Sequence, residues 1–154
     1  MKTLKIVTDK EKLQQISKTV DMSNLKEIQQ LIKNMKKYLE SIPNGAGLSA
    51  IQIGKPLRLF LVDVGEKYPK IIPFINPVIT KYSEEKEYGN EGCLSFPYKY
   101  GNIKRSISVN IEYIDIYNKP RSQTLTGFIA RVTQHEYDHL NGICCVDKMN
   151  KEKD

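Results

Sequence analysis

The chain has 154 residues but only two histidines, and both lie in the segment QHEYDH at residues 134–139. On an α-helix, residues four apart share a face, so His135 and His139 can direct their imidazoles at one cation. Glu136 is rotated from them by roughly 100° and can reach a water on the metal instead of the metal itself. This arrangement is typical of metal-dependent hydrolysis. Such a motif also arises by chance, but a helix that carries every histidine of the chain favours a genuine site.

A catalytic metal site of this kind needs a third protein ligand and one position left open for water. No further histidine exists, and Glu152 lies in a charged tail. Thiolates are the remaining good ligands. Cys144 and Cys145 lie in the apolar stretch ICCV, where a small buried side chain is the commoner role. Cys93 lies in the polar stretch NEGCLSFP, which indicates a loop or strand edge. The spacing therefore favours Cys93 as the third ligand, with Cys144 or Cys145 as weaker alternatives.

Two helices are expected around this motif. Apolar residues at helical spacing predict an N-terminal helix from Asn24 to Leu39, with Asn24 as its N-cap. A second helix is predicted from Gly127 to Leu140, because Asn141-Gly142 is a good helix stop.

Strands are expected between the two helices. Residues 57–64 (LRLFLVDV) predict a buried strand, and residues 71–79 an extended segment. Alternation over residues 107–113 predicts a half-buried strand, with a β-bulge near Tyr113. The expected class is α+β, in which short, mostly antiparallel strands wrap around a central HExxH helix. Residues 1–154 are expected to form a single catalytic domain.

The composition, 40% hydrophobic and 27% charged, is that of an ordinary globular chain. No secretory signal or membrane span is recognisable, so no membrane partner is expected. Three cysteines, two of them adjacent, make a poor disulfide framework and favour a reducing, cytoplasmic setting. The net charge of +6 is dispersed, which predicts no specific nucleic-acid binding but allows weak attraction to a large anionic partner such as the ribosome.

Three segments, taken in order, resemble the peptide deformylase family. Residues 45–52 (GAGLSAIQ) are similar to its GxGLxAxQ motif, residues 91–95 (EGCLS) match its second motif, and residues 134–139 match QHExxH. The resemblance runs from about Leu25 to Met149. Ser49 stands where alanine is common in the family, and this small-for-small change is expected to be harmless.

The resemblance implies the role of each site residue. It implies three metal ligands, namely Cys93, His135 and His139. Glu136 is implied as the catalytic acid/base, and the Gln52 side chain and the Leu94 backbone N–H as stabilisers of the oxyanion. The implied substrate-binding residues are Gly45, Ala46, Gly47, Gly92, Phe128 and Val132. For the first glycines a helix C-cap is an alternative or additional role, and for Phe128 and Val132 ordinary core packing is an equal alternative.

The implied reaction removes the formyl group from the initiator methionine of nascent polypeptides and releases formate. The implied cofactor is one divalent metal ion, Fe²⁺ in the cell, with Zn²⁺, Ni²⁺ or Co²⁺ as alternatives. Two other hypotheses are a zincin-like metallopeptidase and a catalytically silent, metal-stabilised binding module.

Many family members continue into a C-terminal helix associated with ribosome docking, whereas this sequence stops at Asp154. A compact form of this kind also occurs among phage-encoded members. We therefore expect at most weak ribosome contact. The expected location is the cytoplasm, that of the host for a phage-encoded protein, with an organelle as the alternative.

Overall fold

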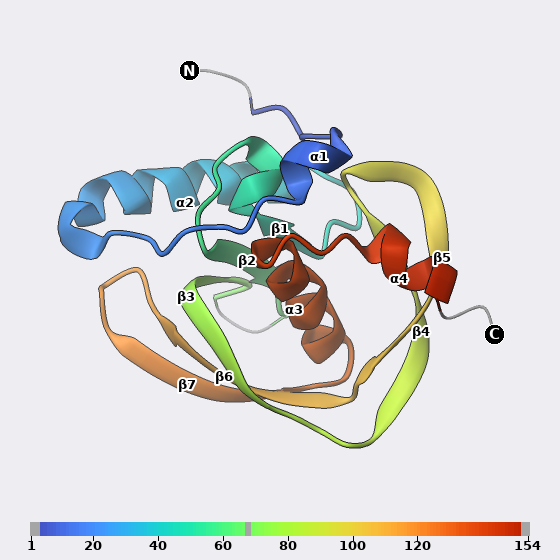
Figure 1. Ribbon diagram of the computed structural model, residues 1–154. Helices are drawn as coiled ribbons and strands as arrows, with labels where there is room; N and C mark the ends of the chain where they lie inside the picture. Colours follow the sequence, from blue (N-terminus) through green and yellow to red (C-terminus); the bar gives the residue numbers. More distant parts are fainter. Residues whose placement is uncertain (1–3, 67–68, 152–154) are drawn as a thin grey trace.

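The computed structural model describes residues 4–66 and 69–151, and its class is α+β, as predicted (Figure 1). The helical elements are α1 (Lys10–Leu13), the 3-10 turn η1 (Met22–Asn24), α2 (Leu25–Glu40), the 3-10 turn η2 (Ala50–Ile53), α3 (Gly127–Leu140) and α4 (Cys145–Lys151). The strands are β1 (Gly47–Ser49), β2 (Leu59–Asp63), β3 (Ile71–Tyr82), β4 (Lys86–Cys93), β5 (Phe96–Ser106), β6 (Ser108–Ile114) and β7 (Pro120–Thr126).

The strands form two antiparallel groups around α3. Five of them make a sheet in the order β1-β2-β3-β6-β7, and β4 pairs with β5 in a separate hairpin. Figure 1 shows α3 in the middle of the molecule, with β6 and β7 on one side and the hairpin on another. The predicted arrangement of strands around the HExxH helix is therefore confirmed.

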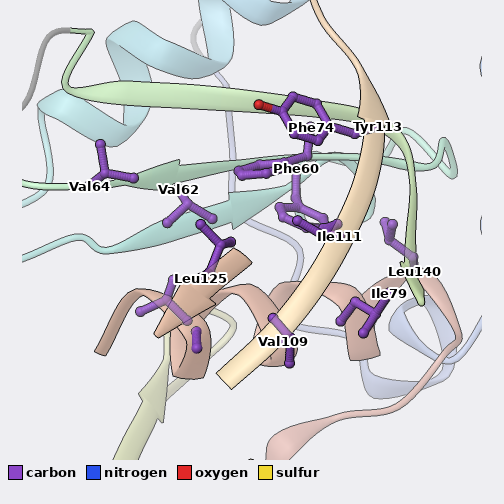
Figure 2. Close-up of a cluster of buried hydrophobic side chains, with 12 residues drawn as sticks. Phe60, Val62, Val64, Phe74, Ile79, Val109, Ile111, Tyr113, Leu125 and Leu140 are labelled. Atoms are coloured by element: carbon purple, nitrogen blue, oxygen red, sulfur yellow. The ribbon is translucent and has the colours of Figure 1, made fainter. Parts of the chain in front are cut away.

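Strand β2 is apolar from Leu59 to Val62 because both faces of the sheet are covered there. Phe60 and Val62 belong to a core cluster shared with α3, as Figure 2 shows. Leu59 and Leu61 belong to a second cluster on the other face, which includes the buried stripe of α2. A strand enclosed on both faces reads as a continuous apolar run, not as an alternating pattern. This explains the segment LFLVD at residues 59–63.

The two predicted helices are confirmed almost to the residue. In α2, the side chain of Asn24 accepts a hydrogen bond from the Glu27 backbone N–H, as an N-cap does. In α3, the helix ends at Leu140 and Gly142 follows with φ 74°. A Cβ at Gly142 would clash with the Gln14 carbonyl oxygen, so glycine is required there for space as well as for backbone conformation.

The β-bulge predicted near Tyr113 lies instead on the neighbouring strand. Strand β6 pairs with β7 without a shift over its whole length. In the β3–β6 pair the register shifts between Ile75 and Val78, and the extra residue belongs to β3. Asn76, with φ 50°, exchanges two hydrogen bonds with the backbone of Val20. Because Pro77 has no N–H to donate, the irregularity falls where pairing would fail anyway.

The sequence patterns did not predict the hairpin β4–β5 or helix α4. The hairpin is polar and mostly exposed, so its strands lack the alternating apolar pattern that marks a half-buried strand. The charged tail with Glu152 lies outside the described residues. Among the residues described, no helix is long and apolar enough to cross a membrane.

Candidate metal centre and active site

Three side chains converge where the hairpin meets the central helix. Cys93 is the last residue of β4, and His135 and His139 lie one turn apart on α3. One ligand atom from each lies within 4.8 Å of the other two. The Cys93 sulfur is 3.4 Å from Nε2 of His139. One thiolate and two imidazoles suit a four-coordinate metal with an open position, so these residues fit the metal that the spacing predicted.

Glu136 is buried beside this group but does not belong to it. The Ser49 hydroxyl donates a hydrogen bond of 2.8 Å to its Oε1. Burial raises the pKa of Glu136, although the nearby His135 and the Ser49 hydroxyl oppose the shift. A carboxylate with a raised pKa, next to a metal site and not coordinating it, suits proton transfer.

Gln52 lies in η2 with its side-chain amide directed at the Cys93 end of the hairpin. Its Oε1 accepts from the Ser49 backbone N–H at 3.0 Å, and its Nε2 donates to Ser95 Oγ at 3.1 Å. The same Nε2 is 3.5 Å from the Cys93 sulfur. Two partners therefore define which end of the amide faces the site. Leu94, at the turn after Cys93, lines a cavity that Gln52 and Cys93 also line.

Glu91 belongs to the EGCLS motif, but the sequence predicted no role for it. Its carboxylate is buried and accepts from Nη2 of Arg105 at 2.9 Å and Nη1 of Arg131 at 2.7 Å. It also hydrogen-bonds Nδ1 of His135 at 3.0 Å. Burial alone would raise the pKa of Glu91, but the hydrogen bonds from His135 and Arg105 lower it to about 2. The carboxylate is thus charged and ties β4, β5 and α3 together.

The two adjacent cysteines have different environments. Cys144 packs with Leu13 and Ile51 in a small apolar cluster, as a buried hydrophobic side chain would. Cys145 is also buried, and its sulfur interacts with Cys93. This interaction, together with burial, raises the pKa of the Cys93 thiol, so metal binding must displace its proton. Among the described residues, neither Cys144 nor Cys145 belongs to the group that could hold a metal.

A cavity of about 650 Å³ opens directly over the site. Every predicted substrate-binding residue lines it, namely Gly45, Ala46, Gly47, Gly92, Phe128 and Val132. Val132 also belongs to the core cluster, whereas Phe128 is 66% exposed at the mouth. Lining residues that sequence reasoning missed include Asn90, Tyr98 and Tyr100. They lie in the polar hairpin, where no local pattern marked them.

Comparison with known proteins agrees with this geometry. The family model described as polypeptide deformylase matches residues 3–154. The peptide deformylase of Rhizobium meliloti (strain 1021) is 38% identical over 144 residues, which cover 92% of this chain and 81% of that protein.

Solved structures give the same result. A probable peptide deformylase from Synechococcus phage S-SSM7 matches with a TM-score of 0.88 at 36% identity, covering 94% of this chain and 99% of that one. A Met-Ala-Ser-bound class I type b peptide deformylase from Acinetobacter baumannii matches with a TM-score of 0.88 at 29% identity, covering 96% and 98%. The chain belongs to the polypeptide deformylase family, metal-dependent hydrolases that remove the N-formyl group from polypeptides.

Proposed function

We propose that residues 1–154 act as a single catalytic domain on the formyl-methionine end of nascent polypeptides, with the residue roles given below. The observation that carries the proposal is the position of the buried Glu136 carboxylate. It lies beside a Cys-His-His group, is not part of that group, and faces a cavity large enough for a peptide end.

Cys93, His135 and His139 would hold one divalent metal ion. When bound, the metal supplies an activated water and polarises the formyl oxygen. Thiolate and imidazole ligands suit Fe²⁺, which we propose as the ion in the cell, and also Zn²⁺, Ni²⁺ or Co²⁺.

The chain's own groups handle the protons and the developing charge. Glu136 takes a proton from the attacking water and passes it to the departing amine. Nε2 of Gln52 and the Leu94 N–H donate to the formyl oxygen as it gains negative charge, a contribution of about 3 to 4 kcal/mol per donor. A neutral amide suits this role, because it donates without adding a charge that would disturb the metal ligands.

The peptide would bind in extended form along β1. This strand lies at the edge of the sheet, and residues 45–47 line the cavity. A strand at the edge of a sheet can accept a peptide as an additional strand. The methionine side chain would fit against Val132 and Phe128, which give the cavity an apolar wall. The Met-Ala-Ser peptide bound by the Acinetobacter enzyme is the kind of product that such a site would release.

The expected macromolecular partners and the cellular location are inferred from charge and composition. A dispersed net charge of +6 supports weak contact with the ribosome and no sequence-specific nucleic-acid binding. Three cysteines that are all free support a reducing, cytoplasmic location.

The test is anaerobic measurement of formate released from a formyl-Met dipeptide by the Fe²⁺-loaded protein and by its Glu136→Gln variant. We expect the variant to retain its metal and to lose at least about 100-fold in rate, because a carboxamide cannot accept the proton. An unformylated peptide should stay intact, whereas a zincin-like peptidase would cleave it. If the fully metallated wild type released no formate, the site would be a silent metal-binding module and the proposal would be wrong.

A further inference from the structure

The hydroxyl of Ser49 lies inside the catalytic site. Ser49 ends β1 and is fully buried. Its Oγ lies 2.8 Å from Oε1 of Glu136 and 3.2 Å from the backbone oxygen of the same residue. A hydroxyl has one proton to donate, and the shorter contact is the one to the carboxylate. The exchange of alanine for serine, which the sequence suggested was harmless, therefore adds a hydrogen bond to the proposed acid/base.

The two oxygens of Glu136 have different surroundings. Oε1 is held by the buried hydroxyl. Oε2 lies over Gly47, where a Cβ would approach it to 2.7 Å. Gly47 lines the cavity, so Oε2 is the oxygen on the side from which substrate and water arrive.

We propose that Ser49 is a positioning residue, whose hydroxyl holds Oε1 of Glu136 and leaves Oε2 to exchange protons with the water and the departing amine. This inference rests on the proposed function. When Oε2 carries the proton, Oε1 still accepts from Ser49, so the hydrogen bond persists through both proton transfers. A carboxylate that is already oriented needs no rearrangement between the two steps.

The same residue also orients the proposed oxyanion donor. The Ser49 backbone N–H holds Oε1 of Gln52 at 3.0 Å, which turns Nε2 toward Cys93. Removing the hydroxyl leaves this backbone contact in place. The Ser49→Ala substitution therefore keeps the backbone contact that orients the Gln52 side chain and removes the hydroxyl from Glu136. It also removes the Ser49 oxygen from the capping box at the start of η2.

The experiment compares steady-state kinetics of the metal-loaded wild type and Ser49→Ala on a formyl-Met dipeptide. We expect kcat to fall about tenfold, the scale of a hydrogen bond to a charged group, while KM stays within about twofold. Metal content should not change. Ser17→Ala is the matched control, because it deletes a buried hydroxyl that has no hydrogen-bond partner among the described residues. Ser17→Ala should leave kcat unchanged, and its unfolding midpoint should be similar to that of Ser49→Ala.

A double-mutant cycle with Glu136→Asp distinguishes positioning from a general packing defect. The shorter side chain cannot both face the cavity and reach Ser49, so Ser49→Ala should cost less than about twofold in that background. An unchanged kcat in Ser49→Ala, or the same loss in both backgrounds, would overturn the positioning role. Absence of formate from the wild type would instead overturn the proposed function itself.

Discussion

Glu91 and His135 form a hydrogen bond between Oε1 and Nδ1, 3.0 Å apart, that joins the hairpin to the central helix. Because Nδ1 is engaged, Nε2 is the nitrogen left for a metal. Glu91 lies two residues before Cys93 on β4, so one strand end carries both a proposed ligand and the group that orients another proposed ligand. His139 differs: among the described residues, its buried Nδ1 has no hydrogen-bond partner. His139 is therefore oriented by packing and by the contact of its Nε2 with the Cys93 sulfur.

Replacing Glu91 with glutamine should weaken metal binding by about 10- to 100-fold. The amide keeps the shape of the side chain but removes the charge that orients His135 and balances Arg105 and Arg131. Competition with a chelator, followed by Zn²⁺ or Co²⁺ titration, measures the change. Glu87→Gln is the matched control, since Glu87 is an exposed carboxylate on the same strand. Equal metal affinity in Glu91→Gln and the wild type would show that the hydrogen bond does not hold the ligand.

Alanine variants of the two adjacent cysteines can test the contact between Cys145 and Cys93. In the metal-loaded protein Cys93 would be a thiolate, so the neighbouring Cys145 S–H would be the group that donates to it. In the Co²⁺-loaded protein, Cys145→Ala should make the Cys93 sulfur a stronger electron donor. The charge-transfer band from that sulfur to Co²⁺ should then move to lower energy. Cys144→Ala, which removes a thiol from the apolar cluster, should leave the band in place. Identical spectra for the two variants would contradict the assignment.

The metal-free protein should lose stability in mild alkali. Burial opposes a charged imidazole, but the hydrogen bond to Glu91 and the Glu136 carboxylate raise the pKa of His135 from 6.5 to about 9. A group whose pKa is raised on folding stabilises the protein fully below its unfolded pKa and loses that contribution as the pH rises through the folded value. The free energy of unfolding should therefore fall between about pH 6.5 and 9, by on the order of 3 kcal/mol.

Urea unfolding of the metal-free and Zn²⁺-loaded protein at both ends of this range measures the effect. With zinc bound His135 is already neutral, so this alkaline loss should disappear. Metal-free Glu91→Gln should also lose much of the dependence, since the carboxylate that raises the pKa of His135 is gone. A metal-free wild type equally stable at both pH values would refute the pairing of Glu91 with a charged His135.

The sequence alone was sufficient to predict features that depend on residues close together in the chain. The apolar period of α2, the stop at Asn141-Gly142 and the spacing of His135 and His139 are each contained within a few turns of chain, where side chains at fixed intervals share a face. Among the remaining ligands the sequence favoured Cys93 over Cys144 and Cys145, and the structure brings Cys93 to both histidines.

Only the tertiary structure decided which polar groups meet across the chain. Glu91 and His135 are 44 residues apart, and Ser49 and Glu136 are 87 apart. Nor could local context separate Cys145, which contacts Cys93, from Cys144, which packs in the core. Burial of apolar side chains gives a periodic pattern in the sequence, because the buried face of a single helix or strand recurs at fixed intervals. A hydrogen bond between two elements leaves none, because its partners are chosen by how the hairpin, the edge strand and the central helix pack together.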